Sequence, residues 1–119
     1  MELVNNVYDR GWHDETQLAG ARGFEFMRIV SDEPEYTSAY SCEFVRLGPE
    51  DHSVTHVERW NHLLWFVEGS GEVTIGEQIW PVRPGSYAKI KAGIKHSVRN
   101  QGGTDMLIIA VYDPPRPRH

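Results

Sequence analysis

The sequence predicts an all-β domain built as a sandwich or a barrel. In the second half of the chain, turn-forming residues recur at positions 69–71, 75–77, 84–85 and 92–93. The segments between these turns are short and strand-like, and short strands at that spacing are typical of sandwiches and barrels. We therefore expect little helix.

Strand patterns also occur before and after this region. Residues 24–30 alternate between two faces and predict one strand, and residues 38–47, rich in Tyr, Phe and Val, predict a longer one. Residues 48–51 have turn chemistry and should close that second strand. Because Pro81 cannot donate to a ladder, its strand should lie at an edge or carry a bulge. The apolar run 105–112 fits a strand covered on both faces.

A chain of 119 residues is long enough to form one domain with a buried core and no disulfides. We expect an N-terminal arm over about residues 1–23 that packs across the sheet, and a tail over about residues 113–119, where prolines prevent a strand from continuing. The lone Cys42 cannot form an internal disulfide, and the first residues lack the pattern of a secretory signal. These two observations predict a cytoplasmic protein.

The charge of the chain and the length of its apolar runs exclude two classes of partner. The net charge is −5 and no cluster of Lys and Arg is present, whereas a nucleic-acid surface needs such a cluster. The longest apolar run, residues 106–112, is too short to cross a bilayer. We therefore expect a small-molecule partner, with no nucleic acid and no membrane.

The stretch from residue 56 to residue 69 contains the first candidate site. His56, Glu58 and His62 fall at even spacing, so a strand here would point all three side chains to one side. Leu63 and Trp65 would point the other way, against a second layer. The sequence therefore predicts a polar cluster that faces the inside of a β scaffold.

Residues 85–100 resemble the second motif of the cupin superfamily, whose members are small β-barrels of jelly-roll type that often hold a metal ion. Gly85, Gly93, His96 and Asn100 stand at the family's spacing, and Lys91 stands where the family usually has Pro. The first motif normally reads His-x-His and then Glu. Here it reads His56-x-Glu58, three residues, His62, six residues and Gly69, so that a His and the Glu have exchanged places.

Carried over position by position, the resemblance implies the metal ligands His56, Glu58, His62 and His96. The exchange preserves three imidazoles and one carboxylate. Such a set suits one divalent transition metal ion, Fe, Mn, Ni, Zn or Cu. Glu58 has two possible roles, either direct ligand or general base beside a three-histidine site.

Several other residues are weaker candidates for the site. Tyr40 and Tyr87 should lie on barrel strands and could supply a phenol near the metal, as general acid or substrate anchor. Trp60 shares the parity of the ligands and could line the pocket, whereas Trp65 should belong to the core. His52 could replace His56 if the strand register slips, although its place beside a turn favours an exposed side chain.

The resemblance implies a metal-dependent enzyme that acts on a small polar metabolite, as an isomerase or lyase. A metal-dependent dioxygenase is one alternative. A non-catalytic module that binds a sugar or a small acid is the other. The resemblance also implies a homodimer.

Overall fold

The computed structural model describes residues 2–14, 22–31, 33–53, 55 and 57–117. Among them the only helical element is a short 3₁₀ turn, η1 (Val7–Asp9). The strands are β1 (His13–Asp14), β2 (Arg22–Val30), β3 (Ser41–His52), β4 (Asn61–Glu68), β5 (Gly71–Ile75), β6 (Gln78–Val82), β7 (Tyr87–Ile90), β8 (His96–Asn100) and β9 (Met106–Asp113). The fold is all-β, as predicted. No helix in the described part of the chain is long and apolar enough to cross a membrane.

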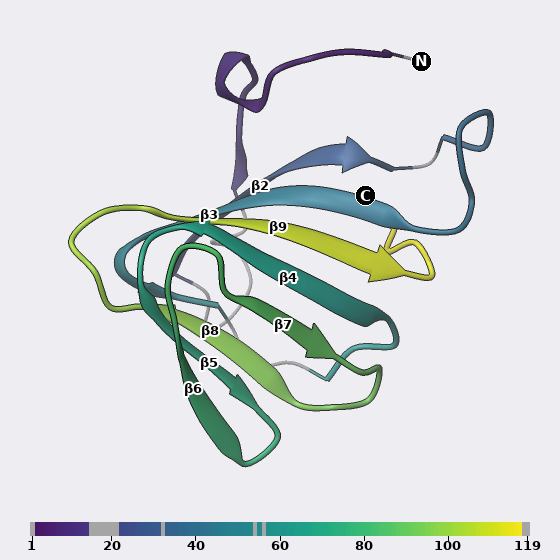
Figure 1. Ribbon diagram of the computed structural model, residues 1–119. Coiled ribbons are helices and arrows are strands. Elements are labelled where there is room, and N and C mark those ends of the chain that lie inside the picture. Colours follow the sequence, from purple (N-terminus) through teal and green to yellow (C-terminus); the bar gives the residue numbers. More distant parts are fainter. Residues whose placement is uncertain (1, 15–21, 32, 54, 56, 118–119) are drawn as a thin grey trace.

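The strands form one strongly bent antiparallel sheet that closes almost completely into a barrel of jelly-roll type. Its order is β6-β5-β8-β3-β9-β4-β7. In addition, β2 pairs with β3 along the edge opposite β9, and β1 pairs with β2. In Figure 1, β8, β5 and β6 lie below the layer that contains β2, β3, β9 and β4. β6 is an edge strand, which confirms the reading of Pro81.

The predicted strand at residues 24–30 is confirmed as β2, but β3 differs from the prediction. It begins at Ser41 and continues to His52 through residues 48–51, which were expected to form a closing turn. Glu50 adopts a positive φ of 64°, and beyond it His52 pairs with Arg99 of β8. The turn-like residues therefore bend β3 from one layer into the other, because a jelly roll needs a corner at this point.

β9 is the central strand of the upper layer. It pairs with β3 on one side and β4 on the other, and five of its first seven residues are buried. This confirms the prediction that the apolar run is covered on both faces. Its inward residues join the main core inside the barrel, around Leu47, Phe66 and Val73.

The outer face of β2, β3 and β9 carries a second, smaller core. Met27, Phe44 and Leu107 are buried there. The described part of the arm packs on them: the rings of Trp12 and Phe44 stack with centroids 5.7 Å apart, and Tyr8 meets Phe44 edge-on at 6.3 Å.

The outer face of β4 is less covered than the sequence indicated. Leu63 and Trp65 do point away from the barrel interior, as the alternation predicted, but Trp65 is 53% exposed. The expectation that Trp65 belongs to the core was therefore wrong, because no described layer covers this face of β4.

Candidate metal centre

Three of the four predicted ligands meet inside the barrel. One donor atom from each of Glu58, His62 and His96 lies within 4.8 Å of the others. Glu58 Oε1 is 3.4 Å from His62 Nε2 and 3.5 Å from His96 Nε2. Both histidines are buried. His56, the fourth predicted ligand, lies outside the described residues.

The two histidines reach the interior because of strand alternation. In β4, His62, Leu64 and Phe66 are buried while their neighbours are not, so the period of two points all three inward. His96 begins β8, whose first, third and fifth residues are buried. The two imidazole centroids are 4.8 Å apart, and the ring of Tyr112 meets His62 edge-on at 4.5 Å.

Glu58 does not lie on the same strand as His62, contrary to the prediction that one strand would carry all the ligands of the first motif. β4 begins only at Asn61, so Glu58 belongs to the connection that precedes it. Two hydrogen bonds hold that connection: Gly93 N donates to Glu58 O at 2.9 Å, and Ala92 N donates to Asn61 Oδ1 at 2.9 Å. The turn of the second motif thus positions the carboxylate of the first.

The hydrogen bonds of the two rings indicate how each could bind a cation. His96 Nδ1 lies 3.0 Å from the carbonyl oxygen of Ile94, which can only accept, so Nδ1 carries a proton, and Nε2 is the nitrogen that faces Glu58 Oε1 and could bind a cation. In His62 both ring nitrogens are buried and neither makes a well-formed hydrogen bond among the described residues, although Nε2 has Glu58 Oε1 beside it at 3.4 Å. Buried polar atoms rarely lack a partner, and a bound cation would supply one.

Glu58 is held in its charged form. Burial alone would raise the pKa of this carboxyl, but the nearby imidazoles of His62 and His96 and the positive charge of Arg116 outweigh burial and leave the pKa well below its usual range. An ionised carboxylate beside two imidazole nitrogens is a mixed oxygen and nitrogen donor set. The residues therefore fit a divalent transition metal ion.

Arg116 is a site residue that the sequence analysis missed. The residues after β9 were expected to form a tail, but Arg116 returns to the pocket and its Nη1 lies 3.3 Å from Glu58 Oε2. Its backbone N donates to the buried Ser41 Oγ at 2.9 Å. No motif indicated this role, because Arg116 is far from Glu58 in the sequence and stands in a proline-rich stretch without strand periodicity.

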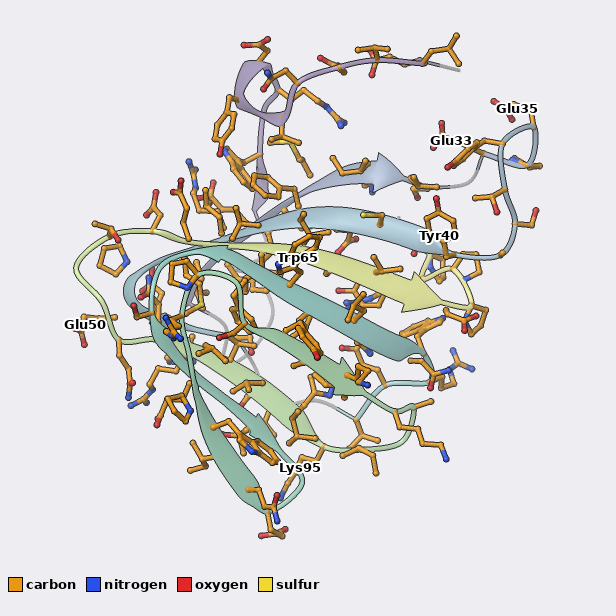
Figure 2. All side chains as sticks on the ribbon, viewed as in Figure 1. Glu33, Glu35, Tyr40, Glu50, Trp65 and Lys95 are labelled. Atoms are coloured by element: carbon orange, nitrogen blue, oxygen red, sulfur yellow. The ribbon has the colours of Figure 1, made fainter. Side chains whose placement is uncertain are left out.

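The other candidates are not brought to the cluster. Tyr87 lies on β7 with 68% of its surface exposed. Tyr40 lies just before β3, near the loop that carries Glu33 and Glu35 (Figure 2), and its hydroxyl is 2.9 Å from that of Tyr36. His52 ends β3 and contacts the carbonyl of Ser53 through Nδ1 at 3.2 Å, and it does not belong to the cluster of Glu58, His62 and His96.

The cluster opens into a small, mostly apolar cavity of about 40 Å³, which has room for an ion and a few atoms. Trp60 packs against the core near its rim, under the guanidinium of Arg116 at 5.6 Å. The cavity is lined by Phe24, Val45, Leu47, Ser53, Glu58, His62, Leu64, His96, Val98, Ile108, Ala110, Tyr112 and Arg116. Among the described lining residues, Glu58 is the only acid and Arg116 is the only arginine or lysine.

Solved structures share this fold at low sequence identity. A predicted oxalate decarboxylase from Thermotoga maritima has a TM-score of 0.84 at 21% identity, and the match covers 94% of this chain and 99% of that one. The polyketide cyclase RemF from Streptomyces resistomycificus has a TM-score of 0.82 at 19% identity, covering 99% and 83%. KdgF from Halomonas sp. has a TM-score of 0.81 at 15% identity, covering 98% and 96%. These likenesses show the fold alone.

A family model identifies the chain more directly. No curated protein matches the chain in sequence. The model of the cupin domain matches residues 43–112, which include the whole of both motifs and more than half of the chain. The barrel, the paired motifs and this match together show that the chain belongs to the cupin family.

Proposed function

We propose that this protein is a metal-dependent enzyme that acts on a small polar metabolite, with non-oxidative chemistry of the isomerase or lyase type. The observation that carries the proposal is His62, whose two buried ring nitrogens make no well-formed hydrogen bond among the described residues while Nε2 faces Glu58 Oε1 at 3.4 Å. The contact with Glu58 compensates only part of the desolvation of this ring, and a bound cation would compensate the rest. His62 therefore gains value as a ligand.

The metal would be held by Glu58, His62 and His96, with His56 as the proposed fourth ligand. A metal bound there would supply Lewis acidity, polarising a carbonyl or hydroxyl of the substrate. The chain's own residues orient the ligand side chains and enclose the site. The carbonyl of Ile94 fixes the ring of His96, and the apolar walls of the cavity exclude water from around the cluster.

Isomerase or lyase chemistry is supported by the charged groups at the cavity. Such reactions stabilise negative charge that develops on a substrate oxygen, and the lining residue Arg116 can contribute to that stabilisation. The names of two structural neighbours, a predicted oxalate decarboxylase and a polyketide cyclase, agree with chemistry of this kind.

A dioxygenase is the second candidate, and the donor set favours it. Without His56 as a ligand, the set is two histidines and one carboxylate, and such a set with open positions is typical of non-haem Fe(II) oxygenases. Oxygen consumption separates the two candidates: protein loaded with Fe(II) should consume oxygen with its substrate only if it is a dioxygenase. A binding module, the third candidate, would bind its ligand without turnover.

Metal analysis of the purified protein tests the proposal. We expect about one transition metal ion per wild-type chain, and a large loss of metal in His62→Ala and Glu58→Ala, because each removes a ligand. His52→Ala is the matched control, since that ring lies outside the cluster, and it should retain the metal. A wild type that takes up none of Fe, Mn, Ni, Zn or Cu would contradict the proposal.

We also propose a cytoplasmic location and a homodimer, which the sequence analysis predicted. The molecular mass in solution tests the second of them.

A further inference from the structure

We infer that Arg116 binds a carboxylate group of the substrate beside the metal cluster, so that the substrate is a small carboxylic acid. The inference rests on the proposed function and names the substrate class of that same site. It is carried by the place of Arg116 on the residues after β9 and by its contact with Glu58.

The guanidinium of Arg116 is fixed at the pocket by several independent contacts. Its side chain is only 15% exposed. The backbone N of Arg116 is tied to Ser41 Oγ on β3, and the guanidinium carbon lies 5.6 Å from the ring centre of Trp60 and 5.3 Å from that of Tyr112. Stacking on aromatic faces orients an arginine while leaving the edge of its planar group available for ligands.

The polar contacts of this guanidinium use one nitrogen. Nη1 lies 3.3 Å from Glu58 Oε2 and 3.4 Å from the hydroxyl of Tyr112. The group also carries N–H donors on Nε and Nη2. Among the described residues neither of these two nitrogens has a side-chain partner. A fork of this kind matches the two oxygens of a carboxylate.

Glu58 joins Arg116 to the metal cluster. Its Oε1 faces both histidines and its Oε2 faces Arg116, so one carboxylate lies between the guanidinium and the two imidazoles. Glu58 and Arg116 balance each other in charge. A divalent cation added to this pair leaves an excess of positive charge in the pocket, which favours an anionic ligand.

The cavity selects a carboxylate over a larger anion. Its volume is about 40 Å³, and apart from the cluster, Arg116, Ser53 and Tyr112 its walls are apolar. A phosphate is larger and carries more oxygens to be hydrogen-bonded, and seven of the thirteen lining residues are apolar and offer no donor from their side chains. A planar carboxylate can pair both of its oxygens with the Nε and Nη2 donors of Arg116, with a small apolar remainder against the wall.

Calorimetric titration of metal-loaded protein tests the inference. The chain is loaded with Zn(II), its metal content is measured, and it is titrated with acetate and malonate, with their neutral analogues acetamide and malonamide, and with inorganic phosphate. The variants are Arg116→Gln and Arg116→Lys. Arg83→Gln is the matched control, since Arg83 is exposed and lies outside the cavity. Circular dichroism and thermal melts establish that each variant is folded.

We expect the wild type and Arg83→Gln to bind malonate more tightly than malonamide. Arg116→Gln should weaken malonate binding by about tenfold or more, because hydrogen bonds to a charged group are lost. Its metal content and its weak binding of malonamide should be unchanged. Arg116→Lys, which keeps the charge and loses the fork, should lie between the two.

Three results would overturn the inference while leaving the metal centre in place. They are undiminished malonate binding by metal-loaded Arg116→Gln, failure of the metal-loaded wild type to bind either acid, and tighter binding of phosphate than of malonate. A wild type that holds no metal would overturn the proposed function and the inference with it, and the metal analysis identifies that case before any titration.

Discussion

His62 and His96 contribute the same side chain to one cluster, and their hydrogen bonds give them different properties. The carbonyl of Ile94 fixes the tautomer and orientation of His96, while His62 is positioned by packing against the rings of Tyr112 and His96. A ring that no backbone hydrogen bond fixes depends more on a bound ligand to hold its orientation. At the scale of the single residue, then, His62 indicates a metal more strongly than His96 does, although His96 stands in the motif that fits the family pattern better.

Cys42 leads to a prediction about thiol reactivity. Burial, with a smaller contribution from the neighbouring charge of Glu43, raises the pKa of this thiol to about 11. The thiolate is the reactive form. At pH 8 the native protein should therefore react with a disulfide reagent far more slowly than the protein unfolded in guanidinium chloride. Equal rates in the two states would contradict this.

The same shift in the pKa of Cys42 predicts a pH dependence of stability. An unfolded cysteine has a pKa of about 8.5, so between that pH and about 11 the native state holds a proton that the unfolded state has lost. Stability should therefore fall as the pH rises through this window. Chemical denaturation of wild type and Cys42→Ala at several pH values measures the effect, and the part that Cys42 causes should be absent in the variant.

Single elements of the barrel are joined by particular residues of the cupin motifs. Asn100, the last residue of β8, is buried and donates from Nδ2 to the carbonyls of Leu47, Gly48 and Thr104, each at 2.9 Å. Its Oδ1 accepts from Gly102 N at 2.9 Å. One side chain thus ties β8 to the bend in β3 and to the β8–β9 connection, which explains its place in the motif.

Asn100→Ala should destabilise the protein by about 2–4 kcal/mol, because four hydrogen bonds are lost and several buried backbone groups are left unpaired. The matched control is Asn61→Ala, which removes one exposed hydrogen bond to Ala92 N and should cost about 1 kcal/mol or less. Urea denaturation of both variants gives the comparison. Equal losses would show that burial of the Asn100 network does not matter.

The start of β5 predicts a second difference between matched variants. Gly71 pairs with both Asn100 and Val82, and a Cβ added there would collide with the carbonyl oxygen of Arg99. Gly71→Ala should therefore cost about 2 kcal/mol or more, since the backbone of a paired strand cannot move aside easily. Gly103→Ala, which meets nothing, should cost less than about 1 kcal/mol. Thermal melts check this order.

At the scale of the whole molecule, β3 and the cluster of Glu58, His62 and His96 join the same two layers. β3 pairs with β9 in the upper layer and reaches β8 through His52. The cluster takes His62 from β4 and His96 from β8. A metal bound there would therefore stabilise the closed barrel as a whole rather than one strand.

Metal binding should accordingly raise the melting temperature. At a free metal concentration about 100 times the Kd, binding adds about 2.7 kcal/mol to the stability of the native state. For a domain of this size that corresponds to a rise of about 10 °C or more, and a chelator should reverse it. His62→Ala should show no such rise. Scanning calorimetry with and without Zn(II) and a chelator measures it, and an equal rise in the variant would place the metal elsewhere.

Local patterns in the sequence were enough to predict the all-β class, the inward direction of His62, the edge position of Pro81 and the central place of β9. Each of these follows from a period of two or from the chemistry of one residue, and both act over a few neighbours. The resemblance to the cupin motifs indicated that Glu58 and His96 belong with His62. The structure brings these three together, while the identity of a bound metal stays a prediction.

The remaining features arise from contacts between residues far apart in the chain. The passage of β3 through residues 48–51, the exposure of Trp65 and the return of Arg116 to Glu58 each depend on what other segments cover or leave open. No local period records this information. Turn-like residues can end a strand or bend it, and a proline-rich end can trail away or pack. Only the closed barrel selects the second outcome for the C-terminal end, because it brings Ser41 and Glu58 into contact with Arg116.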